Sequence, residues 1–247
     1  MTSHPPIADI TSRVSDQGYA FVHGPEMRAL LGAYGSLSDW DRFAASWNDL
    51  GLDTYMADGG RYRKRRFAAF SATSGGITRK PHQPHYQSRD YNTLNGGIER
   101  WFQPVLPEIA AGPAMTTILT FCHALFSRLT PAPAWHVETH QFRIEARRGE
   151  AGQPTPEGLH RDGVDHVLVL LIGRRNIRSG VTSIHHMRGH EIGSFTLTEP
   201  LDAAIVDDAR VMHGVTAVDA VDPAEPGFRD VLVVTFRREA AAAQPTS

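Results

Sequence analysis

Short runs of β-type residues, separated by turn residues, make up most of the chain beyond residue 139. The runs cover residues 140–146, 164–172, 181–185, 192–197, 203–207, 210–217 and 230–237. Many short strands with turn signals between them are typical of a β-sandwich or a β-barrel. This part of the sequence therefore predicts a mainly β fold with flanking helices.

Helical spacing of apolar residues lies in the part of the chain before these runs. It occurs in residues 25–34 and 38–50, after a short strand-like segment at 18–24. The strongest helix candidate is 113–129, because a proline opens it and another proline lies beyond its end. We expect this helix to pack one face against a sheet.

Two segments between these helices have compositions that suggest a role. Residues 75–97 are rich in Gly, Pro, His, Gln and Asn, which predicts a long ordered loop or lid. Residues 61–66, Arg-Tyr-Arg-Lys-Arg-Arg, have the composition of a nucleic-acid patch, but an apolar stretch follows them directly. We interpret this basic run as the solvated edge of a strand.

Composition limits the classes of protein to consider. A length of 247 residues suits a single domain spanning 1–247, with an N-terminal helical region at 1–60 and a β core at about 135–238. The net charge of -2 provides no broad cationic field, which argues against a nucleic-acid partner. A single cysteine excludes an intramolecular disulfide and a multi-thiolate zinc site. Without signal-peptide features or an apolar run approaching roughly 18 residues, we expect a cytoplasmic protein with no membrane partner.

The candidate metal ligands are two histidines and one aspartate. His160 and Asp162 stand two positions apart before the run 164–172, and residues i and i+2 of an extended chain project from the same face. His213 lies within the run 210–217. Two imidazoles and one carboxylate form the facial triad of non-haem iron(II) oxygenases, which leaves coordination positions open for chemistry. We therefore predict that these three residues are catalytic and hold iron.

Arg229 is the candidate anchor for a cosubstrate. It opens Arg-Asp-Val-Leu-Val-Val-Thr-Phe, a strand apolar on both faces that must lie inside the fold. A planar guanidinium in such a place pairs best with a bidentate carboxylate, and the distal carboxylate of 2-oxoglutarate is suitable. By strand alternation Thr235 faces the same interior. A structural salt bridge from Arg229 to an acid such as Asp207 is the alternative.

Other histidines compete for the role of metal ligand. His185, His186 and His190 cluster in a predicted turn, and His82 and His85 lie in the predicted lid. Neither group has the partner set of a zinc site, and histidines in turns are usually solvated.

Several blocks of sequence occur in an order that resembles the bacterial 2-oxoglutarate dioxygenases that hydroxylate free L-amino acids, the L-isoleucine 4-hydroxylase group. The blocks are Arg-Tyr-Arg-Lys-Arg-Arg-Phe at 61–67, Pro-His-Gln-Pro-His-Tyr-Gln at 81–87, Tyr-Asn-Thr-Leu-Asn-Gly-Gly-Ile at 91–98, His-Gln-Phe-Arg-Ile at 140–144, Pro-Thr-Pro-Glu-Gly-Leu-His-Arg-Asp-Gly at 154–163 and Arg-Asp-Val-Leu-Val-Val-Thr-Phe at 229–236. Such an ordered set is much more specific than His-x-Asp alone.

The resemblance implies a double-stranded β-helix, or jelly roll, with Fe(II), 2-oxoglutarate and O2 as cofactor and cosubstrates. It implies the same three iron ligands and the same arginine anchor. The reaction would hydroxylate a free L-amino acid, or oxidise a thioether, with release of succinate and CO2. Such a substrate needs partners for its carboxylate and its ammonium group, and our candidates are Arg143, His85, Tyr86 and Gln87.

Two other classes stay open. A non-oxygenase cupin-like metal protein, such as an isomerase or a small-ligand binding module, would keep the metal residues without needing Arg229. A DNA- or RNA-demethylating oxygenase would need the basic run at 61–66 to form one broad positive face. The sequence does not indicate an oligomeric state.

Overall fold

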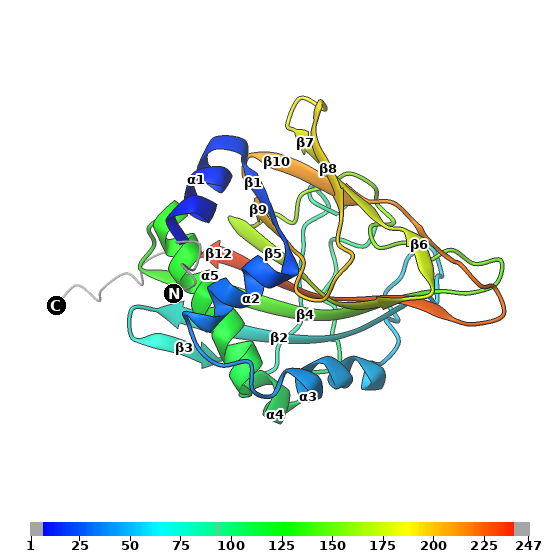
Figure 1. Ribbon diagram of the computed structural model, residues 1–247, viewed down its shortest axis with the longest axis horizontal. Coiled ribbons are helices and arrows are strands. Elements are labelled where there is room, and N and C mark those ends of the chain that lie inside the picture. Colours follow the sequence, from blue (N-terminus) through cyan, green and yellow to red (C-terminus); the bar gives the residue numbers. More distant parts are fainter. Residues whose placement is uncertain (1–6, 93, 240–247) are drawn as a thin grey trace.

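The large sheet of the computed structural model has seven strands in the order β1-β9-β5-β12-β4-β2-β3, all paired antiparallel (Figure 1). The structure describes residues 7–92 and 94–239. The strands of this sheet are β1 (Tyr19–Val22), β2 (Arg63–Thr73), β3 (Gly76–Arg79), β4 (Ala134–Ala146), β5 (His166–Arg175), β9 (Ala203–Asp207) and β12 (Gly227–Arg238).

A smaller sheet faces the large one. It has three strands in the order β10-β7-β8, and a further pair joins β11 to β6. Val167 and Val206 of the large sheet pack against Ile184 and Val211 of the small one, so the two sheets share an apolar interface. The expected mainly β fold with flanking helices is therefore confirmed. These strands are β6 (Ile177–Ser179), β7 (Val181–His186), β8 (Glu191–Thr196), β10 (Val211–Val215) and β11 (Val218–Ala220).

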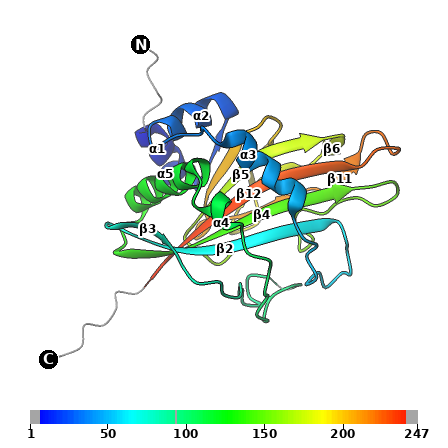
Figure 2. The ribbon, with the colours of Figure 1, turned by 90° about the horizontal axis from the view of Figure 1, so that it is seen from below.

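Helices cover the other face of the large sheet, as Figure 2 shows. Helix α5 has the bounds that its proline signals predict, and its Phe126 packs edge-on against Phe236 of β12. The N-terminal helix α1 was not predicted, although Ile7, Ile10 and Val14 have helical spacing, and it buries Ile10 and Val14 in the same core. The helical elements are α1 (Ile7–Gln17), α2 (Gly24–Gly32), α3 (Trp40–Ala45), the 3-10 turn η1 (Ser46–Asp49), α4 (Pro107–Ala110) and α5 (Pro113–Leu129).

The side chains of β12 point alternately into the hydrophobic core and into a polar space between the two sheets. Leu232, Val234 and Phe236 join the core under the helices. Arg229 and Thr235 face the space between the two sheets instead. Since successive side chains of a strand point to opposite faces, one strand supplies both regions.

The basic run at 61–66 does not form a solvated edge, which corrects our interpretation of it. Residues 63–66 of its strand β2 pair with β4 on one side, and Gly51 and Asp53 hydrogen-bond to their backbone on the other side. Their side chains alternate between the two faces of the sheet. Arg63 and Arg65 are buried between the sheets, while Lys64 and Arg66 point outward and pair with acidic side chains. The run therefore offers no continuous positive face to a nucleic acid.

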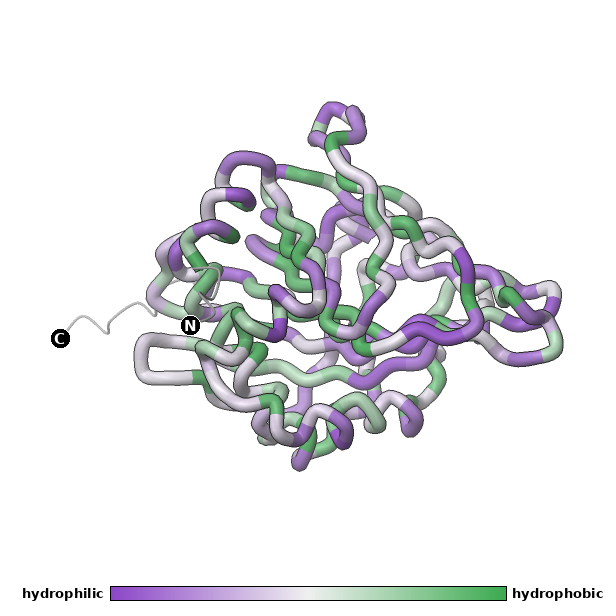
Figure 3. The backbone as a smooth tube through the Cα atoms, viewed as in Figure 1, coloured by the Kyte–Doolittle hydropathy of each residue, from purple (hydrophilic) through white to green (hydrophobic). Residues whose placement is uncertain are grey.

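The predicted lid is partly a hairpin. Its start forms β3, paired with β2, and only the part beyond it is loop, tied down where His85 and Arg100 exchange two backbone hydrogen bonds. Figure 3 shows the tip of the β7–β8 hairpin as a hydrophilic projection, and there His186 and His190 are exposed, as expected for turn histidines. Among the described helices, none is both long and apolar enough to cross a membrane.

Candidate active site

A polar cavity lies between the two sheets, beneath the loop that follows β3. Strands β2, β4, β12 and β10 supply most of its walls. The loop before β5 carries His160 and Asp162 into it. Its charged and histidine lining consists of Arg63, Arg65, His85, Arg100, Glu138, His140, Glu157, His160, Asp162, His213 and Arg229.

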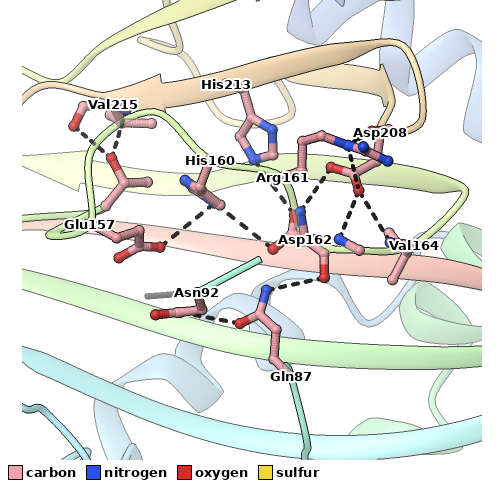
Figure 4. Close-up of polar contacts among 12 residues, drawn as sticks. Gln87, Asn92, Glu157, His160, Arg161, Asp162, Val164, Asp208, His213 and Val215 are labelled. Atoms are coloured by element: carbon pink, nitrogen blue, oxygen red, sulfur yellow. Dashed lines mark hydrogen bonds and ion pairs between the residues drawn. The ribbon is translucent and has the colours of Figure 1, made fainter. Parts of the chain in front are cut away.

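His160, Asp162 and His213 converge at one end of this cavity (Figure 4). Their candidate ligand atoms all lie within 4.8 Å of one another. The Nε2 atoms of His160 and His213 are 3.9 and 3.5 Å from the two carboxylate oxygens of Asp162. The Nδ1 atom of His160 lies 3.0 Å from the carbonyl oxygen of Gly158, so it donates a proton there and leaves Nε2 free to ligate. Two imidazole nitrogens and a carboxylate are a donor set that suits iron(II).

Backbone pairing holds the two histidines side by side. The N–H group of each donates to the carbonyl oxygen of the other, at 3.0 Å in both directions. His160 is therefore bridged to strand β10 and does not belong to β5, which begins six positions later at His166. The local sequence suggested extended chain at His160, but its partner strand is set by the fold.

Burial and neighbouring charges shift the pKa values of the two histidines at this end of the cavity. Burial alone would lower the pKa of His160, but Asp162 and Glu157 outweigh it and raise that pKa. Burial, together with His160, lowers the pKa of His213 to about 3. His213 is thus neutral, with a lone pair available to a metal, throughout the physiological pH range.

Asp208 fixes the loop that carries the candidate ligands, and sequence reasoning missed it. Its buried carboxylate accepts hydrogen bonds from the backbone N–H groups of Asp162, Gly163 and Val164 at 2.9, 2.8 and 3.1 Å. Burial and the nearby Asp162 raise the pKa of Asp208. An acidic residue just past the end of a buried strand was the available signal.

Replacing Asp208 by asparagine is expected to weaken metal binding about 10- to 100-fold, because residues that orient ligands act at that scale. The amide nitrogen cannot accept a backbone hydrogen bond, so the free energy of unfolding should also fall by about 1–3 kcal/mol. Competition titration with a chelating dye and urea denaturation measure the two effects. Asp207→Asn is the matched control, since the Asp207 carboxylate accepts a hydrogen bond only from Ala209 among the residues that the structure describes. Equal metal affinity in both variants would contradict the positioning role.

Arg229 is a buried cation without a partner among the described residues. It is 2% exposed, and its Nε and Nη2 atoms make no hydrogen bond. Burial and the nearby Arg174 lower its pKa to about 10, so it stays charged at neutral pH. No ion pair joins it to Asp207, which removes the structural salt bridge as its explanation. A buried guanidinium that lacks an acceptor fits a carboxylate ligand, as 2-oxoglutarate would supply.

A second group of titratable side chains occupies the opposite wall. Glu138 of β4 accepts from His85 at 2.8 Å, from His136 at 3.2 Å and from His140 at 3.5 Å. Burial alone would raise the pKa of Glu138, but the histidines hold it well below its ordinary value. Burial lowers the pKa of His140 to about 3, and Arg65 donates to its Nδ1 atom at 2.6 Å. These atoms are also close enough for a metal, but the adjoining arginine guanidinium opposes a second cation.

The expected substrate residues divide into three cases. His85 and Gln87 line the cavity, and Gln87 donates to the carbonyl oxygen of Asp162 at 3.1 Å. Tyr86 is 59% exposed and lines an outer groove. Arg143 was wrongly expected there, because it lies on the other face of β4 and pairs with Asp230 at 2.7 Å. Strand alternation gives the physical reason, since its neighbours Phe142 and Ile144 face the cavity.

Comparison with known proteins agrees with this geometry. The profile of the 2OG-Fe dioxygenase family matches residues 44–235. The 3(1)-hydroxy-L-isoleucine 4-dioxygenase of Pantoea ananatis is 27% identical over 240 residues, which make up 93% of this chain and 96% of that protein.

Two solved structures are similar to this chain over nearly its whole length. The structure of a bsmA homolog from Methylobium petroleophilum is similar with a TM-score of 0.88 and 36% identity, over 98% of both chains. The Fe(II)/α-ketoglutarate-dependent dioxygenase TqaL has a TM-score of 0.77 and 21% identity, over 98% of this chain and 90% of that one. The expected double-stranded β-helix is therefore confirmed. Because the family profile covers most of the sequence, the chain belongs to the 2OG-Fe dioxygenase family, whose enzymes use iron(II) and 2-oxoglutarate.

Proposed function

We propose that this enzyme hydroxylates a free L-amino acid, or oxidises the sulfur of one, at an iron(II) ion held by His160, Asp162 and His213. Arg229 binds the distal carboxylate of 2-oxoglutarate, and Thr235 adds a hydroxyl group on the same face of β12. The products besides the oxidised amino acid are succinate and CO2.

The observation that carries the proposal is the unpaired guanidinium of Arg229 in the same cavity as the convergent His-Asp-His set. Leaving a buried charge without a partner is costly, so such a group indicates a ligand that completes it. A cupin-like isomerase or binding module would use the metal residues but has no need for this arginine. The geometry therefore favours the oxygenase.

The protein's own task is to place the reactants and keep water out. Iron(II) with 2-oxoglutarate and O2 supplies the oxidant that transfers one oxygen atom to the substrate. Arg229 orients the cosubstrate through its planar fork, and the apolar side chains of Val169, Val231 and Val233 line the wall around it. Fixing one C–H bond beside the metal selects the product, because reactivity falls steeply with misplacement.

A small zwitterion suits this site better than a nucleic acid. Charged groups of both signs line the cavity, and the loop at 85–100 lies over it. The basic run that a nucleic acid would need is split between two faces of the sheet. A relative at 27% identity is named for a reaction on an L-isoleucine derivative, which supports an amino acid as substrate here.

A panel of the free L-amino acids with iron(II), ascorbate and 2-oxoglutarate is expected to show substrate-dependent succinate release with at least one of them. The product mass should increase by one oxygen, and fragmentation locates the oxygen on carbon or on sulfur. Asp162→Ala protein supplies the background. If no amino acid raises succinate release above that background, the substrate assignment is wrong.

A further inference from the structure

The charges that line the cavity do not balance internally. Three carboxylates face it, from Glu138, Glu157 and Asp162, and they face four arginines. Asp162 belongs to the candidate metal site, and Arg229 to the candidate cosubstrate site. The remaining groups can be examined one by one for a partner within the protein.

The carboxylate of Glu138 already has hydrogen-bond donors within the protein. Both of its oxygens accept hydrogen bonds from histidine rings, and Oε2 alone receives His85 at 2.8 Å and His140 at 3.5 Å. A substrate ammonium group would have to displace these donors. Glu138 is thus a structural carboxylate that orders the wall.

Arg63 and Arg65 also have partners within the chain. Arg63 donates to the buried Asp53 through Nε and Nη2, both at 2.8 Å. Arg65 lies 3.5 Å from the same carboxylate and stacks on Phe102 with its guanidinium carbon 3.6 Å from the ring centre. Asp53 and the Phe102 ring therefore already stabilise the charges of Arg63 and Arg65.

Arg100 has no carboxylate partner among the described residues. It is 2% exposed, its Nε atom is buried without a hydrogen bond, and no described residue accepts from its guanidinium. Its backbone is fixed by the two hydrogen bonds to His85, and its guanidinium carbon lies over the ring of Phe102, 5.8 Å from the ring centre. A fixed, buried and unpaired guanidinium is built to meet an anion.

Glu157 is the matching anion, because one of its two oxygens has no partner among the described residues. Its Oε2 atom is buried without a hydrogen bond, and its side chain is 10% exposed. Its other oxygen lies 3.7 Å from Nε2 of His160, so the carboxylate stands beside the candidate metal site, as Figure 4 shows. It is the one carboxylate lining the described cavity that neither the candidate metal site nor the histidine wall uses.

Arg100 and Glu157 line the same cavity, and no ion pair joins them within 4.0 Å. The negative charge of Glu157 favours the charged form of Arg100, although burial lowers the pKa of Arg100 overall. A molecule in this cavity that carries a carboxylate and an ammonium group on one carbon atom offers a partner to each of them.

We propose that Arg100 binds the α-carboxylate and Glu157 the α-ammonium group of the amino acid substrate. This inference rests on the proposed function, since it assigns the residues that recognise the substrate class proposed there. Because Glu157 adjoins His160, the ammonium end lies on the metal side of the cavity. The position that is oxidised then depends on how far the substrate side chain reaches back toward the metal.

Calorimetric titration tests the two contacts separately. The protein is loaded with zinc(II), which is redox-inert, and with 2-oxoglutarate. It is titrated with the L-amino acid that releases most succinate in the panel, or with L-isoleucine if none does. Two analogues follow: the primary amide, which lacks the carboxylate charge, and the desamino acid, which lacks the ammonium group.

Arg100→Met should weaken binding of the amino acid about 30-fold or more, as for one partner of a buried charge pair, but leave binding of the amide unchanged. Glu157→Gln should weaken binding of the amino acid to a similar extent but leave binding of the desamino acid unchanged. Arg100→Lys keeps the positive charge, so its loss of affinity for the amino acid should be smaller than that of Arg100→Met. The affinity for 2-oxoglutarate should stay the same in all three variants.

The surface pair Arg175 and Glu225 supplies matched controls, because Arg175→Met and Glu225→Gln remove the same groups at 70% and 59% exposed positions. If Arg100→Met and Glu157→Gln bind the amino acid as tightly as the unmutated protein does, the roles of Arg100 and Glu157 are wrong and the proposed function is unaffected. If the unmutated protein binds an amino acid but oxidises none, the proposed function is wrong and the roles of the two residues are unaffected. A protein that binds no amino acid overturns both.

Discussion

Alanine in place of His160, Asp162 or His213 is expected to abolish iron-dependent turnover and to leave the fold intact. Each residue supplies one of the convergent ligand atoms, so two remaining protein ligands would hold iron(II) weakly. The residues lie in the polar cavity and not in the hydrophobic core, so unfolding of the metal-free protein should change little. Equilibrium dialysis with metal analysis, together with succinate release, measures the loss.

Two further variants sharpen this test. Asp162→Glu should also be damaging, because one added methylene moves the carboxylate by more than the tolerance of about 0.5 Å of a preorganised site. His186→Ala is the control, since His186 is exposed at the end of β7. Normal iron binding and turnover in any one of the three alanine variants would remove that residue from the ligand set.

Arg229→Ala is expected to lower the affinity for 2-oxoglutarate about 30-fold to several thousandfold. Removing one partner of a buried charge pair costs roughly 2–5 kcal/mol, which corresponds to that range. Arg229→Lys keeps the charge but loses the planar fork, so its loss should be smaller than that of alanine yet clear. The iron affinity should not change, because Arg229 contacts none of the three candidate metal ligands.

Anaerobic titration of iron-loaded protein with 2-oxoglutarate, followed by the metal-to-ligand charge-transfer absorbance, measures this affinity. Arg175→Ala, at an exposed position, is the control for loss of a positive charge. An unchanged midpoint in Arg229→Ala would move the cosubstrate carboxylate to Arg100, the other unpaired arginine of the cavity. Absence of the absorbance band in the unmutated protein would contradict cosubstrate binding at this site.

Much of the fold could be predicted because local signals agree with it. Prolines mark both ends of α5, and the β-type run at 203–207 coincides with β9. Alternation along β12 places Arg229 and Thr235 on one face, as observed. The N-terminal helix was not predicted, although Ile7, Ile10 and Val14 have helical spacing. Strand β3 was not predicted because it is short and mostly exposed, so that only its pairing with β2 defines it. The extent of a single domain over 1–247 stays a prediction, and residues 1–6 and 240–247 lie outside the described part.

Sequence analysis identified residues of the candidate site only where the spacing along the chain fixes which way the side chains point. His160 and Asp162 are two positions apart, and Arg229 opens a strand apolar on both faces, so residue types and local periodicity single them out. The structure brings the candidate metal ligands together, and their role stays a prediction until iron binding is measured. The same periodicity did not show which face of β4 is the inner one, and Arg143 was therefore placed on the wrong side.

The sequence by itself thus determined the β-rich architecture, the likeness to 2-oxoglutarate dioxygenases and the residue types of the candidate metal site. Tertiary structure alone decided which charges are paired. Asp53 neutralises Arg63, and Asp208 accepts hydrogen bonds from the backbone of the loop that carries Asp162, while Arg100 and one oxygen of Glu157 have no partner among the described residues. The physical reason is that pairing depends on distances across sheets and loops, and these distances follow from strand order and register, which a local pattern does not encode.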